Sequence, residues 1–292
     1  SDLAVGVTAL PAVKLLLASA GLPLRTLVSE RNYPPAKPPA LPWRLLRRCT
    51  YPMADLHWVQ TRLTGDWLRQ HCGVRRQQLV PNSVSWPLPD REPLLEPDDW
   101  VALHQPLILA AGTKARQKGF DRLMPVFTTL ARRDSNLHLA LLGLASGLYR
   151  GLDQQQWLRQ MLGADSDLQK RLLIPGVSGS MASWYARATV FVLPSRFEGF
   201  PNVLLEAMAA GCACIASDCL TGPADLIRHG ENGLLLPVEA TADDWVEAIS
   251  GLLENPDRRR RMGERALLVR EQYGEQRLRR DCLEAMRRLC HG

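Results

Sequence analysis

Short apolar runs alternate with amphipathic segments along almost all of this chain of 292 residues. The apolar runs are predicted strands, and they occupy residues 3–7, 24–29, 56–60, 107–112, 137–143, 171–174, 190–193, 214–217 and 233–236. Segments 120–132, 201–210 and 241–254 have apolar residues at spacings of three and four, which predicts helices. Such alternation is typical of parallel sheets covered by helices, so the sequence predicts an α/β fold.

A proline-rich stretch divides the chain. Residues 86–105 hold Pro87, Pro89, Pro93 and Pro97 with acidic residues between them. Proline cannot donate to a strand ladder and halts helices, so this stretch is predicted to be a linker. It separates residues 1–85 from residues 106–274, and only the second part is long enough for a complete doubly wound sheet. The remaining residues, 275–292, continue a helical, arginine-rich C-terminal region.

The net charge of +6 indicates an anionic partner, such as a nucleotide, a phosphorylated lipid or a membrane surface. Aromatic residues make up only 6% of the chain and form no basic–aromatic run, so a nucleic-acid partner is not expected. The arginines between residues 258 and 288 are either a solvated helix face or a contact with an anionic membrane.

The chain has no signal-like start and no apolar stretch of the roughly 18 residues that span a bilayer. We therefore expect a cytoplasmic protein, peripheral to the inner face of the membrane. Cys212, Cys214 and Cys219 lie close together, but their spacings are not those of zinc-ligand pairs. We expect reduced thiols and no metal site.

The most informative stretch is residues 194–211, PSRFEGFPNVLLEAMAAG, which follows a predicted strand. Pro201 is expected at the first helical position, where its missing N–H does no harm. The next amides, of Asn202 and Val203, would open a helix whose N-terminus favours anions by roughly 0.3–1 kcal/mol. Gly199 lets the backbone approach a ligand. This turn therefore predicts a diphosphate site.

Two glutamates flank that turn. Glu206 lies four residues after Asn202 and so shares its helix face, away from the apolar side. Glu206 is placed to accept hydrogen bonds from ribose hydroxyls, and Glu198 from the hydroxyls of a sugar beyond the phosphates. The alternative is an ordinary strand–turn–helix with two surface glutamates.

A basic loop, residues 111–119, follows another predicted strand. Lys118, beside Gly119, is a candidate phosphate ligand, and Arg116 is a second. Ligands of open parallel sheets bind outside the carboxyl ends of the strands, so the two loops are expected to converge. The alternative is a basic surface loop without a ligand.

These residues resemble the retaining glycosyltransferases of group 1, also called GT4, which have the GT-B fold of two Rossmann-type domains. The resemblance spans roughly residues 79–290. Its core is the pair Glu198 and Glu206, which are separated by seven residues as in the E-x7-E motif of that family. Further matches occur in order at residues 81–84 (PNSV), 117–123 (QKGFDRL), 183–195, 221–227 and 230–237.

The resemblance implies roles for individual residues. Glu198 and Lys118 would be catalytic, holding the donor sugar and the diphosphate. The donor would also be contacted by Gly112, Arg116, Val177, Gly199, Phe200, Pro201, Asn202, Val203 and Glu206. Arg31 and Asn32, within residues 29–34 (SERNYP), would lie on the acceptor side. The last helix would cross back to the first domain, and the nucleotide sugar is a substrate, with no further cofactor implied.

The sequence departs from the family at two points. Thr113 stands where arginine is common, so Lys114 or Arg116 would have to compensate. The first domain lacks a glycine-rich first loop, so we expect a shortened N-terminal Rossmann-like domain and a missing N-terminal segment or partner subunit.

The predicted function is transfer, with retention, of a hexose or N-acetylhexosamine from a nucleotide-diphosphate sugar, UDP being the expected nucleotide. The acceptor would be a glycan or polyprenyl-linked glycan of cell-surface polysaccharide or lipopolysaccharide biosynthesis. One alternative is a truncated or split, non-catalytic subunit that binds nucleotide sugar. Another is a glycosidase that uses Glu198 and Glu206 as its carboxylate pair, which the neighbouring anion site disfavours.

Overall fold

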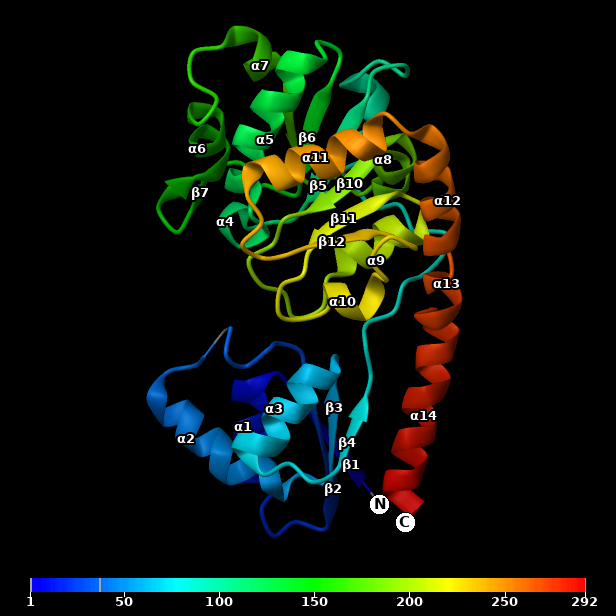
Figure 1. Ribbon diagram of the computed structural model, residues 1–292. Coiled ribbons are helices and arrows are strands. Elements are labelled where there is room, and N and C mark those ends of the chain that lie inside the picture. Colours follow the sequence, from blue (N-terminus) through cyan, green and yellow to red (C-terminus); the bar gives the residue numbers. More distant parts are fainter. Residues whose placement is uncertain (1, 37, 292) are drawn as a thin grey trace.

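The computed structural model describes residues 2–36 and 38–291, which form two Rossmann-like domains with parallel sheets (Figure 1). The sheet of the N-terminal domain has the order β1-β2-β3-β4, and each neighbouring pair is parallel. Its strands are β1 (Asp2–Val7), β2 (Leu24–Glu30), β3 (Leu56–Val59) and β4 (Gln77–Leu79). Its helices are α1 (Ala9–Ala18), α2 (Leu41–Thr50), η1 (Tyr51–Met53) and α3 (Arg62–Cys72).

The C-terminal domain has a larger sheet, with the order β12-β11-β10-β5-β6-β9. The strands are β5 (Leu107–Ala111), β6 (His138–Leu142), β9 (Leu172–Gly176), β10 (Val190–Leu193), β11 (Cys214–Ser217) and β12 (Leu234–Leu236). The connecting helices are α4 (Ala115–Lys118), α5 (Phe120–Arg133), α6 (Gln154–Gln160), α7 (Ser166–Arg171), α8 (Met181–Arg187), α9 (Asn202–Ala209), α10 (Pro223–Leu226) and α11 (Ala242–Leu253). A separate antiparallel hairpin joins β7 (Leu148–Tyr149) to β8 (Leu152–Asp153).

Each predicted strand occurs within one or two residues of its expected bounds, whereas β4, β7 and β8 were missed. The central strand β10 is fully buried on both faces, as its uninterrupted apolar run predicts for a parallel sheet. The missed strands have two or three residues, too few to show a period in the sequence.

The proline-rich stretch at residues 86–105 contains only a short turn, η2 (Pro97–Asp99), among its described elements. It lies against the C-terminal domain. The carbonyl of Leu95 accepts hydrogen bonds from the Ser180 hydroxyl at 2.7 Å and the Trp184 indole at 2.6 Å. The stretch predicted as a linker is therefore held to the domain that follows it.

The C-terminal helices connect the two domains. α12 (Pro256–Ala266), α13 (Val269–Gln272) and α14 (Glu275–His291) run down one side of the molecule from the larger sheet to the smaller one (Figure 1). Ala285 of α14 is buried with Leu27, Trp58 and Val80 of the N-terminal domain. The predicted return of the last helix to the first domain is thus present. Among the described helices, none is long and apolar enough to cross a membrane.

Candidate functional site

The basic loop after β5 lies against the end of β10. Gly119 ends α4 in the left-handed region, with φ of 70°. A Cβ at Gly119 would be 2.0 Å from the carbonyl oxygen of Pro194, so only glycine permits this approach. The two loops that the sequence predicts to converge are in contact through this glycine.

The side chain of Lys118 passes over Gly112, where a Cβ would be 2.6 Å from its Cγ. The ammonium reaches Glu198, and Nζ lies 2.8 Å from Oε1. The hydroxyl of Ser195 donates to the same oxygen at 2.6 Å. Both charged side chains are largely buried, with 14% and 5% of their surfaces exposed. Two donors therefore fix the Glu198 carboxylate at the point where β10 ends.

The start of α9 differs in detail from the expectation. Pro201 is the residue before the helix and not its first residue, and the amide of Asn202 donates to the carbonyl of Phe200 at 3.1 Å. The expected role of the Asn202 amide as a free donor is therefore wrong. Leu204 and Leu205 donate to the carbonyl of Pro201, which leaves the Val203 amide without a partner inside the helix.

The side chain of Phe200, a predicted donor residue, is buried. Only 8% of the residue is exposed, and its ring centroid lies 6.0 Å from that of Tyr273. The ring anchors the turn to the core, so only the backbone of Phe200 remains for a donor. Asn202, by contrast, is exposed.

Glu206 is half-buried on the same side of α9 as Asn202 and accepts a hydrogen bond from the Tyr185 hydroxyl at 3.0 Å. Burial raises the pKa of the Glu206 carboxyl. The Tyr185 hydrogen bond and the positive charges of Lys118 and Arg91 lower that pKa in part. Glu206 therefore lies within the electrostatic reach of the same ammonium that pairs with Glu198.

The loop after β2 meets this cluster from the N-terminal domain. A Cβ at Gly199 would lie 2.9 Å from the carbonyl oxygen of Arg31 and 3.5 Å from Cα of Asn32. The guanidinium of Arg31 donates to the Asn82 side chain, whose amide donates to Asn202 Oδ1 at 2.5 Å. The predicted acceptor-side and donor-side residues are thus brought together.

Several residues of the site were not found by sequence reasoning. Asn82 belongs to the PNSV match, but nothing local in the sequence indicates that it joins Arg31 to Asn202. Glu30 is 2% exposed and accepts from the Tyr51 hydroxyl at 2.8 Å, and burial raises the pKa of its carboxyl. Arg91 lies in the proline-rich stretch, where nothing in the sequence indicates a role in the site. Its positive charge lowers the pKa of Glu206, which depends on how that stretch packs against the C-terminal domain.

Two predicted donor residues, Val177 and Arg116, are exposed. Val177 follows β9 and is 50% exposed. Arg116 is exposed and lines a separate cavity beside α4. Within residues 2–36 and 38–291, no disulfide joins the cysteines and no cluster of three or more metal-ligating side chains occurs.

The fold and site together define the GT-B class of glycosyltransferase structures. The chain superposes on HepE from Anabaena, solved in complex with UDP, with a TM-score of 0.84 and 17% identity; the match covers 98% of this chain and 78% of HepE. At that identity, the likeness concerns the fold.

The chain belongs to the group 1 glycosyl transferases, because the model of that family matches residues 98–268. It is 29% identical to an uncharacterized glycosyltransferase of Haemophilus influenzae, over 62% of this chain and 49% of the relative. It is also 26% identical to the N-acetylgalactosamine-N,N'-diacetylbacillosaminyl-diphospho-undecaprenol 4-alpha-N-acetylgalactosaminyltransferase of Campylobacter jejuni, over 80% of this chain and 60% of that enzyme. The chain therefore spans less than two thirds of the length of either relative.

Proposed function

We propose that this protein transfers a hexose or N-acetylhexosamine, with retention, from a UDP-sugar to a glycan or lipid-linked glycan used in cell-surface polysaccharide biosynthesis. The observation that carries the proposal is the 2.8 Å pair between Lys118 and Glu198 beyond the carboxyl end of β10, with Glu206 on α9, the helix that follows. Family membership supports glycosyl transfer as the reaction class.

The cluster suits a reaction in which negative charge develops on a departing diphosphate. The acceptor oxygen bonds to C1 of the sugar as the bond between C1 and the diphosphate oxygen breaks, and the acceptor proton passes to the diphosphate. Lys118 and the amide of Val203 would stabilise the leaving group, which is electrostatic catalysis. Glu198 would accept hydrogen bonds from sugar hydroxyls, and Glu206 from ribose hydroxyls.

The names of similar proteins support the choice of donor and acceptor. HepE was solved with UDP, and the Campylobacter enzyme is named for a diphospho-undecaprenol acceptor. We extend both chemistries to this chain because its site pairs a cation with hydroxyl-accepting carboxylates.

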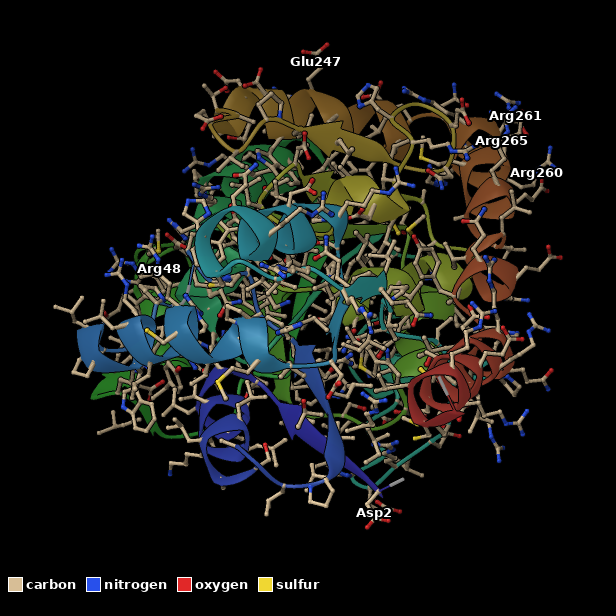
Figure 2. The ribbon with its side chains drawn as sticks, turned by 90° about the horizontal axis from the view of Figure 1, so that it is seen from below. Asp2, Arg48, Glu247, Arg260, Arg261 and Arg265 are labelled. Atoms are coloured by element: carbon tan, nitrogen blue, oxygen red, sulfur yellow. The ribbon has the colours of Figure 1, made fainter. Side chains whose placement is uncertain are left out.

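The proposal is tested by assaying a panel of UDP-sugars for transfer and donor hydrolysis. Lys118→Ala and Glu198→Gln should each lower kcat by about 100-fold or more, because each removes a group that acts on the reacting sugar phosphate. Glu247→Gln, on the exposed face of α11 (Figure 2), is the matched control and should behave as wild type. The anomeric configuration of the product, read by NMR, tests retention.

Three outcomes would contradict the proposal. Wild-type turnover in Lys118→Ala or Glu198→Gln would remove the assigned site. Binding of UDP-sugar without transfer to any acceptor would indicate a non-catalytic subunit. Hydrolysis of aryl glycosides in the absence of nucleotide would indicate a glycosidase.

We also propose peripheral contact with an anionic membrane, and the structure favours α2 for that contact. Leu41 and Leu45 of α2 are 62% and 58% exposed, and Arg44 and Arg48 of the same helix are also exposed, the latter labelled in Figure 2. On α12, by contrast, Arg260 pairs with Asp257 and Glu264. Substitution of both leucines by glutamate should abolish sedimentation with anionic vesicles, and unchanged sedimentation would reject this surface.

A further inference from the structure

A cavity lies beside α4 and the turn that precedes Glu198. It has a volume of about 610 Å³ and is lined by residues from α4, α6, the β7–β8 hairpin and the turn before Glu198. That volume is in the range of small-ligand sites. Ala36, in the loop after β2, lines it from the N-terminal domain. We call it the hairpin pocket.

The lining of the hairpin pocket is strongly cationic. Lys114, Arg116, Arg150 and Arg196 line it, and no aspartate or glutamate does so among the described residues. Arg196 is neutralised by Asp121, with both guanidinium nitrogens 2.7 Å from the carboxylate. Within the described parts of the chain, the side chains of Lys114, Arg116 and Arg150 form no ion pair. Three positive charges are thus left uncompensated around one cavity, which attracts a multiply charged anion.

The other wall of the hairpin pocket is aromatic. Tyr149, Trp157 and Phe197 line it, and the guanidinium of Arg150 lies 5.6 Å from the Tyr149 ring centroid. Flat apolar rings accommodate the face of a sugar ring or an isoprenoid chain, while guanidinium groups bind phosphate through paired hydrogen bonds. The lining is therefore suited to a phosphate joined to a less polar group.

The pocket adjoins the segments that carry Lys118 and Glu198, and one predicted donor residue, Arg116, lines it. Arg196 and Phe197 directly precede Glu198, and Gln117 directly precedes Lys118. The two segments are hydrogen-bonded to each other, since the Arg196 amide donates to the Gln117 carbonyl at 2.9 Å and the Gln117 side chain donates to the Phe197 carbonyl at 3.3 Å. The pocket and the Lys118–Glu198 pair therefore share these two hydrogen-bonded segments.

We propose that the hairpin pocket is an acceptor subsite that binds a phosphate group carried by the acceptor. This inference rests on the proposed transferase function and specifies the acceptor class. The phosphate belongs either to a phosphorylated sugar or to a polyprenyl phosphate carrier. In both cases it binds Lys114, Arg116 and Arg150, while the attached group lies along Trp157 and Tyr149 and the acceptor hydroxyl extends toward Glu198.

The test uses the full chain with saturating UDP, so that the donor site is occupied, and glucose 1-phosphate as the soluble probe in calorimetric titrations. Wild type should bind glucose 1-phosphate and not glucose. Lys114→Ala/Arg150→Ala should weaken binding by about tenfold or more, because each lost charge-assisted hydrogen bond is worth roughly 1.5–3 kcal/mol. Arg260→Ala/Arg261→Ala removes the same charge from exposed α12 and should leave binding unchanged (Figure 2).

A second arm identifies the source of the phosphate. Phosphatidylcholine vesicles with and without polyprenyl phosphate are sedimented with wild type and with both double variants. If sedimentation with the vesicles requires polyprenyl phosphate and is lost only in Lys114→Ala/Arg150→Ala, the phosphate belongs to a lipid carrier. If the protein binds glucose 1-phosphate but does not sediment with polyprenyl phosphate, the phosphate belongs to a sugar.

The subsite is rejected if neither probe binds, if glucose binds as tightly as its phosphate, or if both double variants weaken binding equally. Separate titration of wild type with UDP distinguishes this failure from failure of the donor site. Phosphate binding without UDP binding would reject the proposed donor and retain the pocket.

Discussion

Two glycines decide where the Lys118 ammonium lies. Gly112→Ala would place a Cβ 2.6–2.9 Å from three carbons of the flexible Lys118 side chain, so the lysine must move, and the φ of 155° at Gly112 adds backbone strain. We expect transfer to fall nearly as far as in Lys118→Ala, with a loss of about 1–2 kcal/mol in the free energy of unfolding from that strain. Kinetics and thermal unfolding of the same sample separate the two effects.

Gly119→Ala should reduce the free energy of unfolding more than Gly112→Ala does. Its Cβ would overlap the Pro194 carbonyl at 2.0 Å, and the left-handed backbone adds strain, so we expect a loss of about 3 kcal/mol or more in the free energy of unfolding. Gly163→Ala is the control, because Gly163 has φ of 68° but no atom within 4 Å of the added Cβ. Equal losses in the two variants would show that contact with β10 does not fix the loop.

His57 gives the N-terminal domain a pH-dependent stability. Burial lowers its pKa from 6.5 to about 4, against a smaller opposing effect of the Arg76 carbonyl. The unfolded chain therefore binds a proton that the folded chain does not, and the free energy of unfolding should fall by up to about 3 kcal/mol as the pH drops through this interval. Denaturant titrations across the interval should show this loss in wild type and in exposed His104→Gln, but not in His57→Phe.

Residue types and spacing predicted the centre of the site but not its supports. Lys118, Glu198 and Glu206 were found because each follows a strand in a stretch with a recognisable pattern. Tyr185 lies 21 positions before Glu206, and Asn82 lies 120 positions before Asn202. Such partners are chosen by packing, for which no local pattern exists. The same holds for the Phe200 ring, whose burial depends on contact with Tyr273.

Among the elements, α14 is the one whose removal should separate the domains. Ala285 is 7% exposed and packs on the first sheet beside Leu27 and Trp58. Ala285→Arg should cost about 2–4 kcal/mol, because a long charged side chain would replace a methyl group packed in the apolar cluster of Leu27, Trp58 and Val80. Thermal unfolding and limited proteolysis of α14 measure the effect. Gln276→Arg adds the same charge at an exposed position of α14 and should be silent.

Most strands could be predicted from the sequence, and the exceptions are β4, β7 and β8. Long apolar strands such as β5 and β10 were predicted because burial on both faces demands uninterrupted apolar residues. β4 has the sequence QQL and is held by pairing with β3, which polar residues do not reveal. The β7–β8 hairpin has two residues in each strand, and its position over the cationic pocket was not predictable.

At the scale of the whole molecule, Asn82 links the two domains across the site. It accepts hydrogen bonds from Arg31 and Gln60 and donates to Asn202. Asn82→Ala should lower kcat/KM for transfer by about tenfold, because it removes hydrogen bonds that hold acceptor and donor residues together. Small-angle scattering should show a larger radius of gyration if the domains separate.

Ser85→Ala is the control for that experiment. It removes a hydrogen bond of 2.7 Å to Glu275 of α14, outside the Lys118–Glu198–Glu206 cluster. Wild-type kinetics are expected for Ser85→Ala. Equal kinetic effects of the two substitutions would mean that Asn82 acts only as a general contact between domains. The sequence could not predict this link, since strand and helix patterns define each domain but not their relative orientation.

The central claim is that a nucleotide diphosphate lies between the start of α9 and Lys118. A crystal structure of the protein soaked with UDP tests it most directly. We expect a diphosphate oxygen about 3 Å from Lys118 Nζ and a ribose hydroxyl at a similar distance from the Glu206 carboxylate. UDP bound elsewhere, with the Lys118–Glu198 pair unchanged and no ligand near α9, would contradict the account.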